Sequence, residues 1–180
     1  MQTQTFTVER LSTPTGPMRL VTDEQQRLRA LDWDDHEDRM LRLFQRGYGR
    51  DAVRLRELPA RSSAARALEA YFAGELDAVA SLPTAARGTP FQEAVWAALR
   101  SIPSGQTLSY GALAARLGQP TAARAVGMAN GANPIAIVVP CHRVIGANAS
   151  LTGYGGGMER KRWLLEHEGR ALRLPFAATG

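Results

Sequence analysis

An ordered series of helix start and stop signals in the second half of the chain constrains the fold most. Thr89-Pro90-Phe91-Gln92 has the pattern of a capping box with proline at the first helical position. Ser109 can cap a second helix over residues 110–117, and Thr121 can cap a third that reaches about residue 130. A glycine-containing turn separates these two short helices. The pattern predicts a helix-turn-helix, although many such helix pairs bind no nucleic acid.

The third of these helices has an almost bare surface. Its residues with little or no side chain are Ala122, Ala123, Ala125, Gly127 and Ala129. Arg124 is the one long side chain near its start. Two interpretations fit this composition: the helix packs closely against another helix, or it lies in a DNA groove and uses Arg124 as a probe.

The first half of the chain predicts a small antiparallel sheet. Residues 5–10, 18–22 and 28–33 have the composition of strands, and dense turn chemistry separates the first two. Helices are predicted over residues 36–46 and 63–73, where the second has a regular apolar spacing and ends at a glycine.

A linker divides the predicted fold. Residues 76–88 contain Pro83 and show little periodicity, so we place the boundary between two subdomains there. The predicted division is an N-terminal α/β domain over 1–82, a linker over 83–88, a C-terminal helix-turn-helix domain over 89–172 and a tail over 173–180. The fold class is therefore α+β for the whole chain, with the sheet in the first domain and a helical second domain.

The charge of the chain favours an anionic partner. Lysines and arginines number 22 against 17 acidic residues, the net charge is +5, and Lys161 is the only lysine. The guanidinium group of arginine has several hydrogen-bond donors in one plane that can bind phosphate, so nucleic acid is a candidate partner. A proteome that is rich in arginine would explain the same charge equally well. No apolar run approaches the roughly 20 residues of a membrane span, and residues 1–10 lack a signal-peptide stretch. We expect a cytoplasmic protein with no membrane contact.

The chain has one cysteine, Cys141. A single cysteine forms no internal disulfide and excludes a multi-cysteine zinc site, and three histidines are few for a metal centre. We therefore expect no metal and no cofactor. Residues 135–139 are all apolar, which predicts a buried strand that leads toward the cysteine. A lone cysteine is most often a small buried hydrophobic residue, so its surroundings decide its role.

Glycines and positive charges follow the cysteine. Glycines at 153 and 155–157 surround Tyr154, a composition typical of a mobile loop or of a loop that closely approaches a ligand. The last predicted helix, residues 159–167, has three positive charges among its first four residues. Positive charge opposes the dipole at a helix N-terminus, which favours an external anion nearby.

Pro140-Cys141-His142-Arg143-Val144 resembles the active-site signature of the methylated-DNA–protein-cysteine methyltransferases, also called O6-alkylguanine-DNA alkyltransferases. Other segments follow in that family's order and spacing: Phe91-Gln92, Val95-Trp96, Ile102-Pro103, Ser109-Tyr110-Gly111, Ala123-Arg124-Ala125-Val126-Gly127 and Asn133-Pro134. Residues 89–169 carry the strongest similarity, and Tyr71-Phe72-Ala73-Gly74 resembles the constitutive bacterial branch. The resemblance implies a ribonuclease H-like N-terminal domain and a winged helix-turn-helix-like C-terminal domain.

The same resemblance implies DNA repair by direct reversal of damage. A protein of this family flips an O6-alkylated guanine out of double-stranded DNA and takes the alkyl group onto its cysteine, here Cys141. The thioether is stable, so each molecule is expected to act once, without a cofactor. The expected protein is a monomer that works on nucleoid DNA; activity on O4-alkylthymine and cooperative assembly on DNA stay open.

Alkyl transfer needs a thiolate, because a thiol is a poor nucleophile. The resemblance implies that His142 activates Cys141 through a bridging water and that Glu168 holds the histidine. On the predicted strand, neighbouring side chains point to opposite sides, so a direct bond between the two residues is not expected. From the sequence alone, an exposed position at the end of a helix suits Glu168 better.

The resemblance also assigns contacts to DNA. Tyr110 matches a tyrosine that donates a proton to guanine N3. Arg124 matches an arginine that fills the gap left by the flipped base, and Asn133 matches a residue that orders the turn near the cysteine. The implied DNA-binding residues are Tyr110, Gly111, Ala122, Ala123, Arg124 and Gly127. The implied alkylguanine pocket comprises Val144, Tyr154, Gly155 and Gly156. A glycine at 155 further predicts a roomy lid that accepts adducts larger than methyl.

Three rival functions account for parts of the sequence. A non-catalytic alkylguanine-binding protein shares the DNA-binding features but lacks the nucleophile that is present here. A helix-turn-helix regulator accounts for the charge and the helices and leaves the Pro-Cys-His-Arg context unexplained. A cysteine hydrolase needs a remote histidine beside the thiol, and neither His36 nor His167 has a supporting motif.

Overall fold

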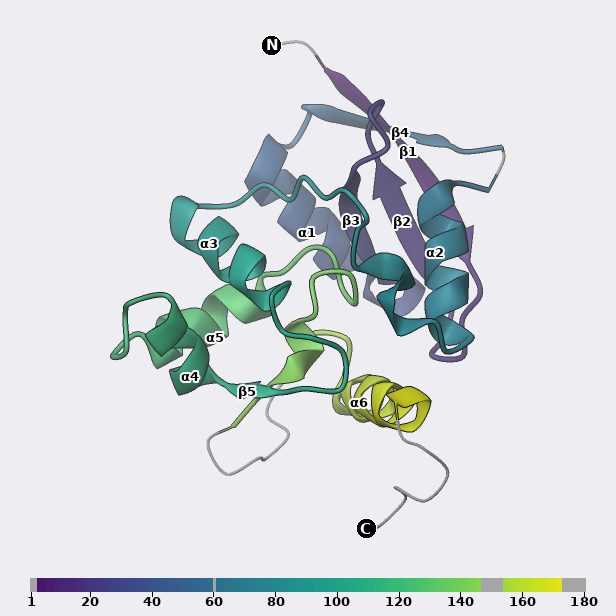
Figure 1. Cartoon of the computed structure of the whole chain (residues 1–180). Helices are drawn as coiled ribbons and strands as arrows, with labels where there is room; N and C mark the ends of the chain where they lie inside the picture. Colours follow the sequence, from purple (N-terminus) through teal and green to yellow (C-terminus); the bar gives the residue numbers. More distant parts are fainter. Residues whose placement is uncertain (1–2, 60, 147–153, 173–180) are drawn as a thin grey trace.

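The computed structural model describes residues 3–59, 61–146 and 154–172 (Figure 1). The predicted tail, 173–180, and residues 147–153 of the glycine-rich segment lie outside these ranges. The strands are β1 (Gln4–Leu11), β2 (Met18–Thr22), β3 (Leu28–Trp33), β4 (Val53–Glu57), β5 (Leu108–Ser109) and β6 (Val144–Ile145). The α-helices are α1 (Glu37–Tyr48), α2 (Ser63–Phe72), α3 (Pro90–Leu99), α4 (Tyr110–Arg116), α5 (Ala123–Gly131) and α6 (Met158–Leu172). Short 3₁₀ helices are η1 (Asp34–His36), η2 (Leu76–Val79) and η3 (Cys141–Arg143).

The N-terminal sheet has four strands in the order β3-β2-β1-β4. The three predicted strands are present, and β2 runs antiparallel to both β1 and β3. The fourth strand, β4, was not predicted, and it pairs in parallel with β1, so the sheet is mixed rather than purely antiparallel. Its sequence, Val-Arg-Leu-Arg-Glu, is charged and mostly exposed, as is common for a strand at the edge of a sheet.

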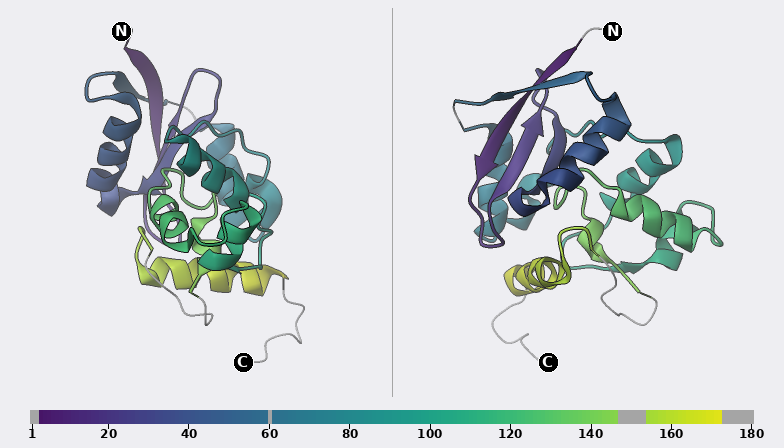
Figure 2. Two further views of the ribbon diagram at one scale, coloured as in Figure 1. Left: turned by 90° about the vertical axis from the view of Figure 1, so that its left-hand side faces the viewer. Right: turned by 180° about the vertical axis from the view of Figure 1, so that it is seen from behind.

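Alternate residues of the sheet enter two separate cores. Leu20 and Leu31 pack into the main core, whereas their neighbours Val21 and Ala30 pack with Met40 of α1 on the other face. This alternation follows from the two-residue period of a strand. Helix α2 joins the main core, so α1 and α2 cover opposite faces of the sheet, as the side view in Figure 2 shows.

The outer edge of β3 is covered by two segments from further along the chain. Near Leu28, the backbone pairs with Pro83 and Ala85 of the predicted linker. Near Leu31, the backbone accepts a hydrogen bond from Ala136 N at 2.9 Å and donates one to the Pro134 carbonyl at 2.9 Å. The second pairing ties the sheet directly to the segment that precedes the cysteine.

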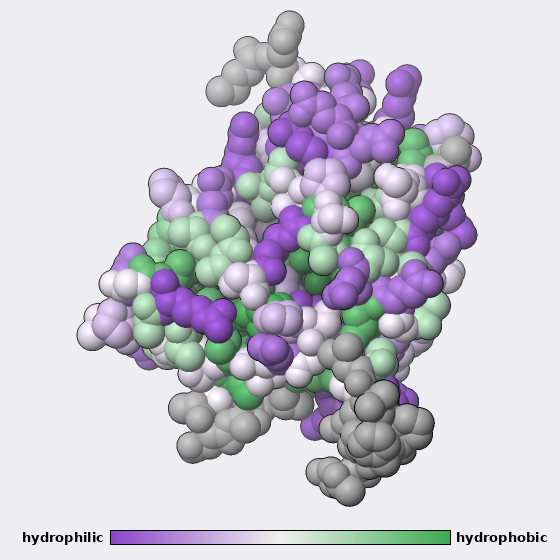
Figure 3. All heavy atoms as spheres, viewed as in Figure 1, coloured by the Kyte–Doolittle hydropathy of each residue, from purple (hydrophilic) through white to green (hydrophobic). Residues whose placement is uncertain are grey.

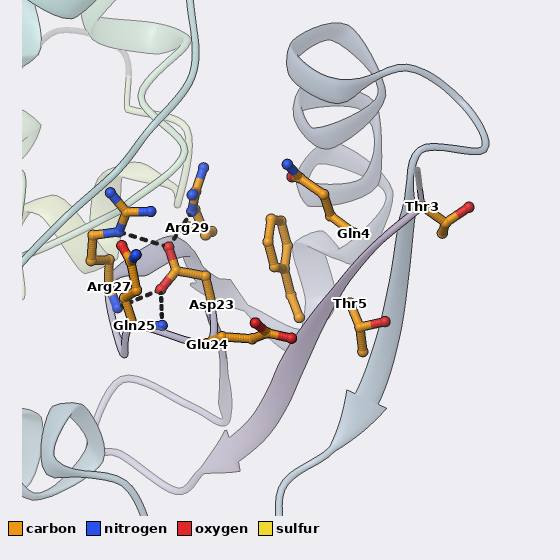
Figure 4. Close-up of a pocket in the computed structure, with 9 residues that line it drawn as sticks. Thr3, Gln4, Thr5, Asp23, Glu24, Gln25, Arg27 and Arg29 are labelled. Carbon is orange, nitrogen blue, oxygen red and sulfur yellow. Dashed lines mark hydrogen bonds and ion pairs between the residues drawn. The ribbon is translucent and has the colours of Figure 1, made fainter. Parts of the chain in front are cut away.

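The turn between β2 and β3 is built around one carboxylate. Asp23 accepts hydrogen bonds from the backbone of Gln25 and Arg27 and forms ion pairs with the side chains of Arg27 and Arg29, both at 2.8 Å. Figure 4 shows this group beside a polar hollow under the first residues of β1. Burial tends to raise the pKa of Asp23, but these hydrogen bonds and charges outweigh it and lower that pKa. The carboxylate is therefore fully used in holding the hairpin.

The helix signals of the second half are mostly confirmed. Thr89 caps α3 by accepting from Gln92 N at 3.1 Å, while the Gln92 side chain accepts from Thr89 N at 2.9 Å, so the capping box is complete. Ser109 caps α4 by accepting from Ala112 N at 3.0 Å. The predicted cap at Thr121 is wrong: α5 starts at Ala123, and its N-cap, Ala122, makes no side-chain capping bond.

The predicted strand over residues 135–139 is also wrong, although all five residues are buried. The segment is a compact turn in which Val138 N donates to the Ala136 carbonyl at 2.8 Å, across Ile137 with a φ of 70°. This is a γ-turn with positive φ, a rare and strained geometry for a β-branched residue. An apolar run reports burial but not backbone shape, because buried strands and buried turns draw on the same residues.

Candidate active site

Two consecutive tight turns present Cys141 to the interior. After the γ-turn at Ile137, Cys141 N donates to the Val139 carbonyl at 2.8 Å across Pro140, whose φ of −81° and ψ of 65° define an inverse γ-turn. Cys141 then opens η3 and is only 6% exposed. In Figure 1 this green segment lies between α5 and α6, at the junction of the two halves of the chain.

Two asparagines fix these turns. Asn133 Nδ2 donates to the carbonyls of Val139 at 2.8 Å and Ile135 at 3.2 Å, and its Oδ1 accepts from Ile135 N at 3.0 Å. Asn130 Nδ2 donates to the Cys141 carbonyl at 3.3 Å. These side chains supply the backbone partners that a sheet would otherwise provide, which is why an apolar segment can be buried here without being a strand.

A small pocket of about 40 Å³ opens beside the cysteine. Its wall is formed by Arg39, Tyr110, Gly127, Asn130, Gly131, Asn133, Ala136, Cys141, Tyr154, Gly155 and Gly156. The structure thus brings together most of the predicted catalytic and pocket residues. A volume of this size holds only a few waters, so a guanine base can enter only if the wall moves.

Other predicted residues lie elsewhere. Val144 is buried in β6 and is not part of the pocket wall. Gly111 and Arg124 are exposed on α4 and α5, and Ala122 and Ala123 are half-buried at the start of α5. Tyr110 packs over Gly127: a Cβ built at that glycine would lie 3.7 Å from the tyrosine ring.

Glu168 is fully buried, so the expectation of an exposed helix-end residue is wrong. Its Oε1 lies 2.7 Å from His142 Nε2 and accepts from Tyr71 OH at 2.9 Å. Arg143 donates to the same carboxylate from Nε at 3.0 Å and from Nη2 at 2.8 Å. Gly105 N also donates to Glu168 Oε2, at 3.4 Å. We call Glu168, His142, Arg143 and Tyr71 the Glu168 cluster.

The electrostatics of the Glu168 cluster favour one arrangement of protons. His142 and Arg143 hold the pKa of the Glu168 carboxyl far below its usual range, although burial alone would raise it. Burial lowers the pKa of His142 despite the neighbouring carboxylate. A neutral His142 therefore donates from Nε2 to Glu168, which leaves Nδ1 as an acceptor. Within the described residues this Nδ1 has no hydrogen-bond partner, so it is available as a base.

The Cys141 thiol is not pre-ionised in this structure. Burial raises its pKa, and the neighbouring Asn133 side chain together with the charges of Arg39 and Lys161 only partly counters this. To act as a nucleophile, the Cys141 thiol would need a base that takes its proton.

Two of the three positive charges at the start of α6 bind groups of the protein itself, while the third, Arg162, is exposed. Arg160 pairs with Asp35 at 2.9 Å and donates to the Thr15 carbonyl, and its guanidinium lies 4.9 Å from the centre of the Trp33 ring. Lys161 is fully buried, and its Nζ donates to the Val144 carbonyl at 2.7 Å. The prediction of an external anion at this helix end is therefore not needed to explain either residue.

Sequence reasoning missed several residues of the site. Arg143 stood inside the signature without a role, and Tyr71 was noted only as part of a bacterial segment. Arg39 and Asp32 carried no signal at all, because nothing in the sequence places α1 beside Cys141.

The predicted room over Gly155 is also absent. A Cβ built at Gly155 would overlap the guanidinium of Arg39, and one built at Gly156 would overlap the Trp33 ring. The space that a glycine leaves here is thus filled by the N-terminal half of the chain. The glycine at 155 therefore gives no reason to expect that adducts larger than methyl fit under the lid.

No helix in the described ranges is both long and apolar enough to cross a membrane. No three histidine, cysteine, aspartate or glutamate side chains in the part that the structure describes come together as metal ligands would.

Comparisons with known proteins agree with this geometry. Residues 8–86 match the family described as 6-O-methylguanine DNA methyltransferase, ribonuclease-like domain, and residues 90–170 match the corresponding DNA binding domain. A Salmonella typhimurium protein named methylated-DNA–protein-cysteine methyltransferase is 54% identical over 164 residues, which cover 91% of this chain and 96% of the relative. The chain belongs to this methyltransferase family. The resemblance that the Cys141 signature indicated is therefore confirmed.

Solved structures support the same family. The crystal structure of Mycobacterium tuberculosis OGT in complex with DNA is 42% identical, with a TM-score of 0.75, and the match covers 92% of this chain and 94% of that one. The O6-methylguanine-DNA methyltransferase from the archaeon Pyrococcus kodakaraensis is 30% identical, with a TM-score of 0.70 and coverage of 91% and 99%. The predicted fold class, a function in DNA repair by alkyl transfer, and DNA as a partner are confirmed at the level of the family.

Proposed function

We propose that Cys141 removes the alkyl group from O6-alkylguanine in double-stranded DNA in a single, irreversible step. One observation carries the proposal: the buried thiol lines a pocket at the junction of two halves of the chain, next to a histidine held by a buried carboxylate. A thiol in a plain apolar core would have no base beside it. The family to which the chain belongs supports the choice of substrate.

The proposed step is a displacement at the alkyl carbon. Cys141 Sγ forms the S–C bond while the C–O6 bond breaks, and the bonding electrons stay with the guanine. His142 Nδ1 takes the thiol proton, directly or through a water, and Glu168 stabilises the resulting imidazolium. The guanine takes a proton at N3 from Tyr110, and exchange with solvent returns the proton from His142 to Tyr110. The products are guanine and the Cys141 thioether.

The DNA-contacting surface is proposed on α5. This helix carries exposed Arg124 and, one turn later, Met128, which is 74% exposed. Small residues, Ala122, Ala123 and Gly127, allow close approach to a minor groove, where little sequence information is read. Arg124 would then fill the space of the flipped base. In Figure 3 the area over α4 and α5 mixes apolar with strongly hydrophilic residues, whereas the surface over β1 and β4 is mostly hydrophilic.

The remaining parts of the proposal concern the state of the protein. We propose that a monomer acts on alkylated DNA in the cytoplasm, with an N-terminal domain over 1–82, a linker over 83–88 and a DNA-binding domain over 89–172. Asn133 would keep Cys141 in place by holding the turn before it. Tyr154, Gly155 and Gly156 would close over the flipped base.

Intact-protein mass spectrometry tests the function. The protein is incubated with excess duplex DNA that carries one O6-methylguanine, and Cys141→Ala is the control. The expected result is one added methyl per chain, never more, and none in the variant. If the mass stays unchanged while the protein still prefers damaged DNA, the chain is a non-catalytic sensor, and the proposal is wrong.

A further inference from the structure

One arginine of the N-terminal half reaches the wall of the Cys141 pocket. Arg39, on α1, donates from Nε at 2.9 Å and from Nη2 at 2.6 Å to the two carboxylate oxygens of Asp32 on β3. Asp32 is only 3% exposed and also accepts from Trp33 N at 2.8 Å. Such a two-point pair fixes the plane of the guanidinium as well as its position. We call it the Arg39–Asp32 pair.

The remaining nitrogen of this guanidinium, Nη1, faces the lid. It is the atom that a Cβ at Gly155 would overlap most severely. Gly155 and Cys141 line the same pocket of about 40 Å³, so Arg39 occupies volume directly beside the space that the alkyl group must use. Nothing in the proposed transfer step calls for this residue.

We propose that Arg39 is a specificity-determining residue that limits the size of the alkyl group that Cys141 accepts, with Asp32 as its positioning residue. The inference rests on the proposed function. Because the alkyl carbon must reach Sγ, any further atoms of the adduct have to lie among the pocket walls. A methyl group adds little volume, whereas a benzyl group must displace the guanidinium. A charged, hydrogen-bonding edge is also a poor surface against which to bury an apolar ring.

The test compares two substrates on one protein. Single-turnover rates are measured with the same duplex carrying O6-methylguanine or O6-benzylguanine, and the readout is the ratio of the benzyl rate to the methyl rate. Arg39→Ala is expected to raise this ratio about tenfold, the usual lower bound for changing the fit of an apolar group in a pocket. Arg42→Ala, which removes an exposed arginine from the same helix, is expected to leave the ratio unchanged. The ratio does not depend on how much of the variant is folded.

A second pair of variants tests the contact itself. Gly155→Ala is expected to slow methyl transfer in the presence of Arg39, because the new methyl group and the guanidinium cannot share the space. The double variant with Arg39→Ala is expected to recover most of that loss. Recovery would not be seen if Arg39 acted only as a surface charge for DNA.

The outcomes separate this inference from the proposed function. Wild-type protein that transfers methyl, together with an unchanged substrate ratio in Arg39→Ala, overturns the size limit and leaves the transfer reaction intact. The absence of any methyl transfer by the wild type overturns both. A raised ratio in Arg39→Ala, with rescue of Gly155→Ala, supports the inference.

Discussion

Two arginine–carboxylate systems lie near Cys141, and they differ in how firmly they are held. In the Glu168 cluster, one fully buried carboxylate accepts hydrogen bonds from His142, Arg143 and Tyr71. In the Arg39–Asp32 pair, the carboxylate is buried but the arginine side chain is 19% exposed and lies at the pocket wall. The first system can orient a base without moving, whereas the second has room to move when a substrate enters.

Both systems draw on the N-terminal half. Tyr71 on α2 donates to Glu168, and Arg39 on α1 and Asp32 on β3 form the outer pair. Cys141 and the proposed base, His142, come from the C-terminal half, whereas Tyr71, Arg39 and Asp32 come from the N-terminal half. The N-terminal half thus completes the site instead of merely accompanying it.

The largest effect is expected from Glu168→Gln. It leaves the buried Arg143 charge without its partner, which typically costs about 3–5 kcal/mol in the free energy of unfolding. It also removes the group that orients His142, so methyl transfer should slow by about a hundredfold or more. Urea unfolding and single-turnover kinetics measure the two effects, with exposed Glu166→Gln on the same helix as the control. Equal behaviour of the two variants would mean that the cluster is dispensable.

The second prediction concerns pH. The pKa values of Glu168 and His142 are both lowered in the folded protein, so the unfolded chain binds these protons at a higher pH. Their contribution to stability is present above the unfolded values, roughly 6.5 for histidine and 4.3 for glutamate, and is lost as the pH falls below them. Each extra proton on the unfolded chain lowers stability by about 1.4 kcal/mol per pH unit. Below about pH 4.3, urea unfolding should therefore show a shallower decline for Glu168→Gln than for the wild type, because the variant lacks the carboxyl that the unfolded chain protonates there. Parallel curves in that range would contradict the assignment.

A smaller effect is expected from Asp32→Asn, which weakens the outer system. Loss of a hydrogen-bonded charge partner at a partly exposed arginine should cost about 1–3 kcal/mol, less than the loss at Glu168. Freed from its partner, Arg39 should move more easily, so the ratio of benzyl to methyl transfer should rise, but by less than in Arg39→Ala. Exposed Asp51→Asn serves as the control. A larger loss of stability at Asp32 than at Glu168 would reverse the comparison drawn here.

Local sequence signals were enough to predict the helices, whereas the arrangement of the site depends on contacts between distant parts of the chain. The capping box at Thr89 and the cap at Ser109 are formed by residues three apart, so the sequence alone predicts them. The apolar run before Cys141 predicted burial correctly and backbone shape wrongly, because Asn133 bonds to the turn from outside it. Resemblance alone indicated Glu168, whose burial depends on Tyr71 from the other half of the chain.

Arg39 is a residue of the site that the sequence did not predict. Its place on the polar side of an amphipathic helix gives no hint of a role, and only the packing of α1 against β3 brings it to the pocket. A sequence can show which residues a site contains when they follow a family pattern. It does not show which residue of a different domain occupies the space between them.

The pairing of Leu31 with the turn around Ile135 has a consequence for how the protein acquires reactivity. These residues are far apart in the chain, and contacts between distant segments form late and slowly during folding. Until β3 and this turn meet, Cys141 lacks the part of the pocket wall that Arg39 of the N-terminal half supplies. A newly made molecule therefore completes the surroundings of its cysteine only once both halves have folded and joined.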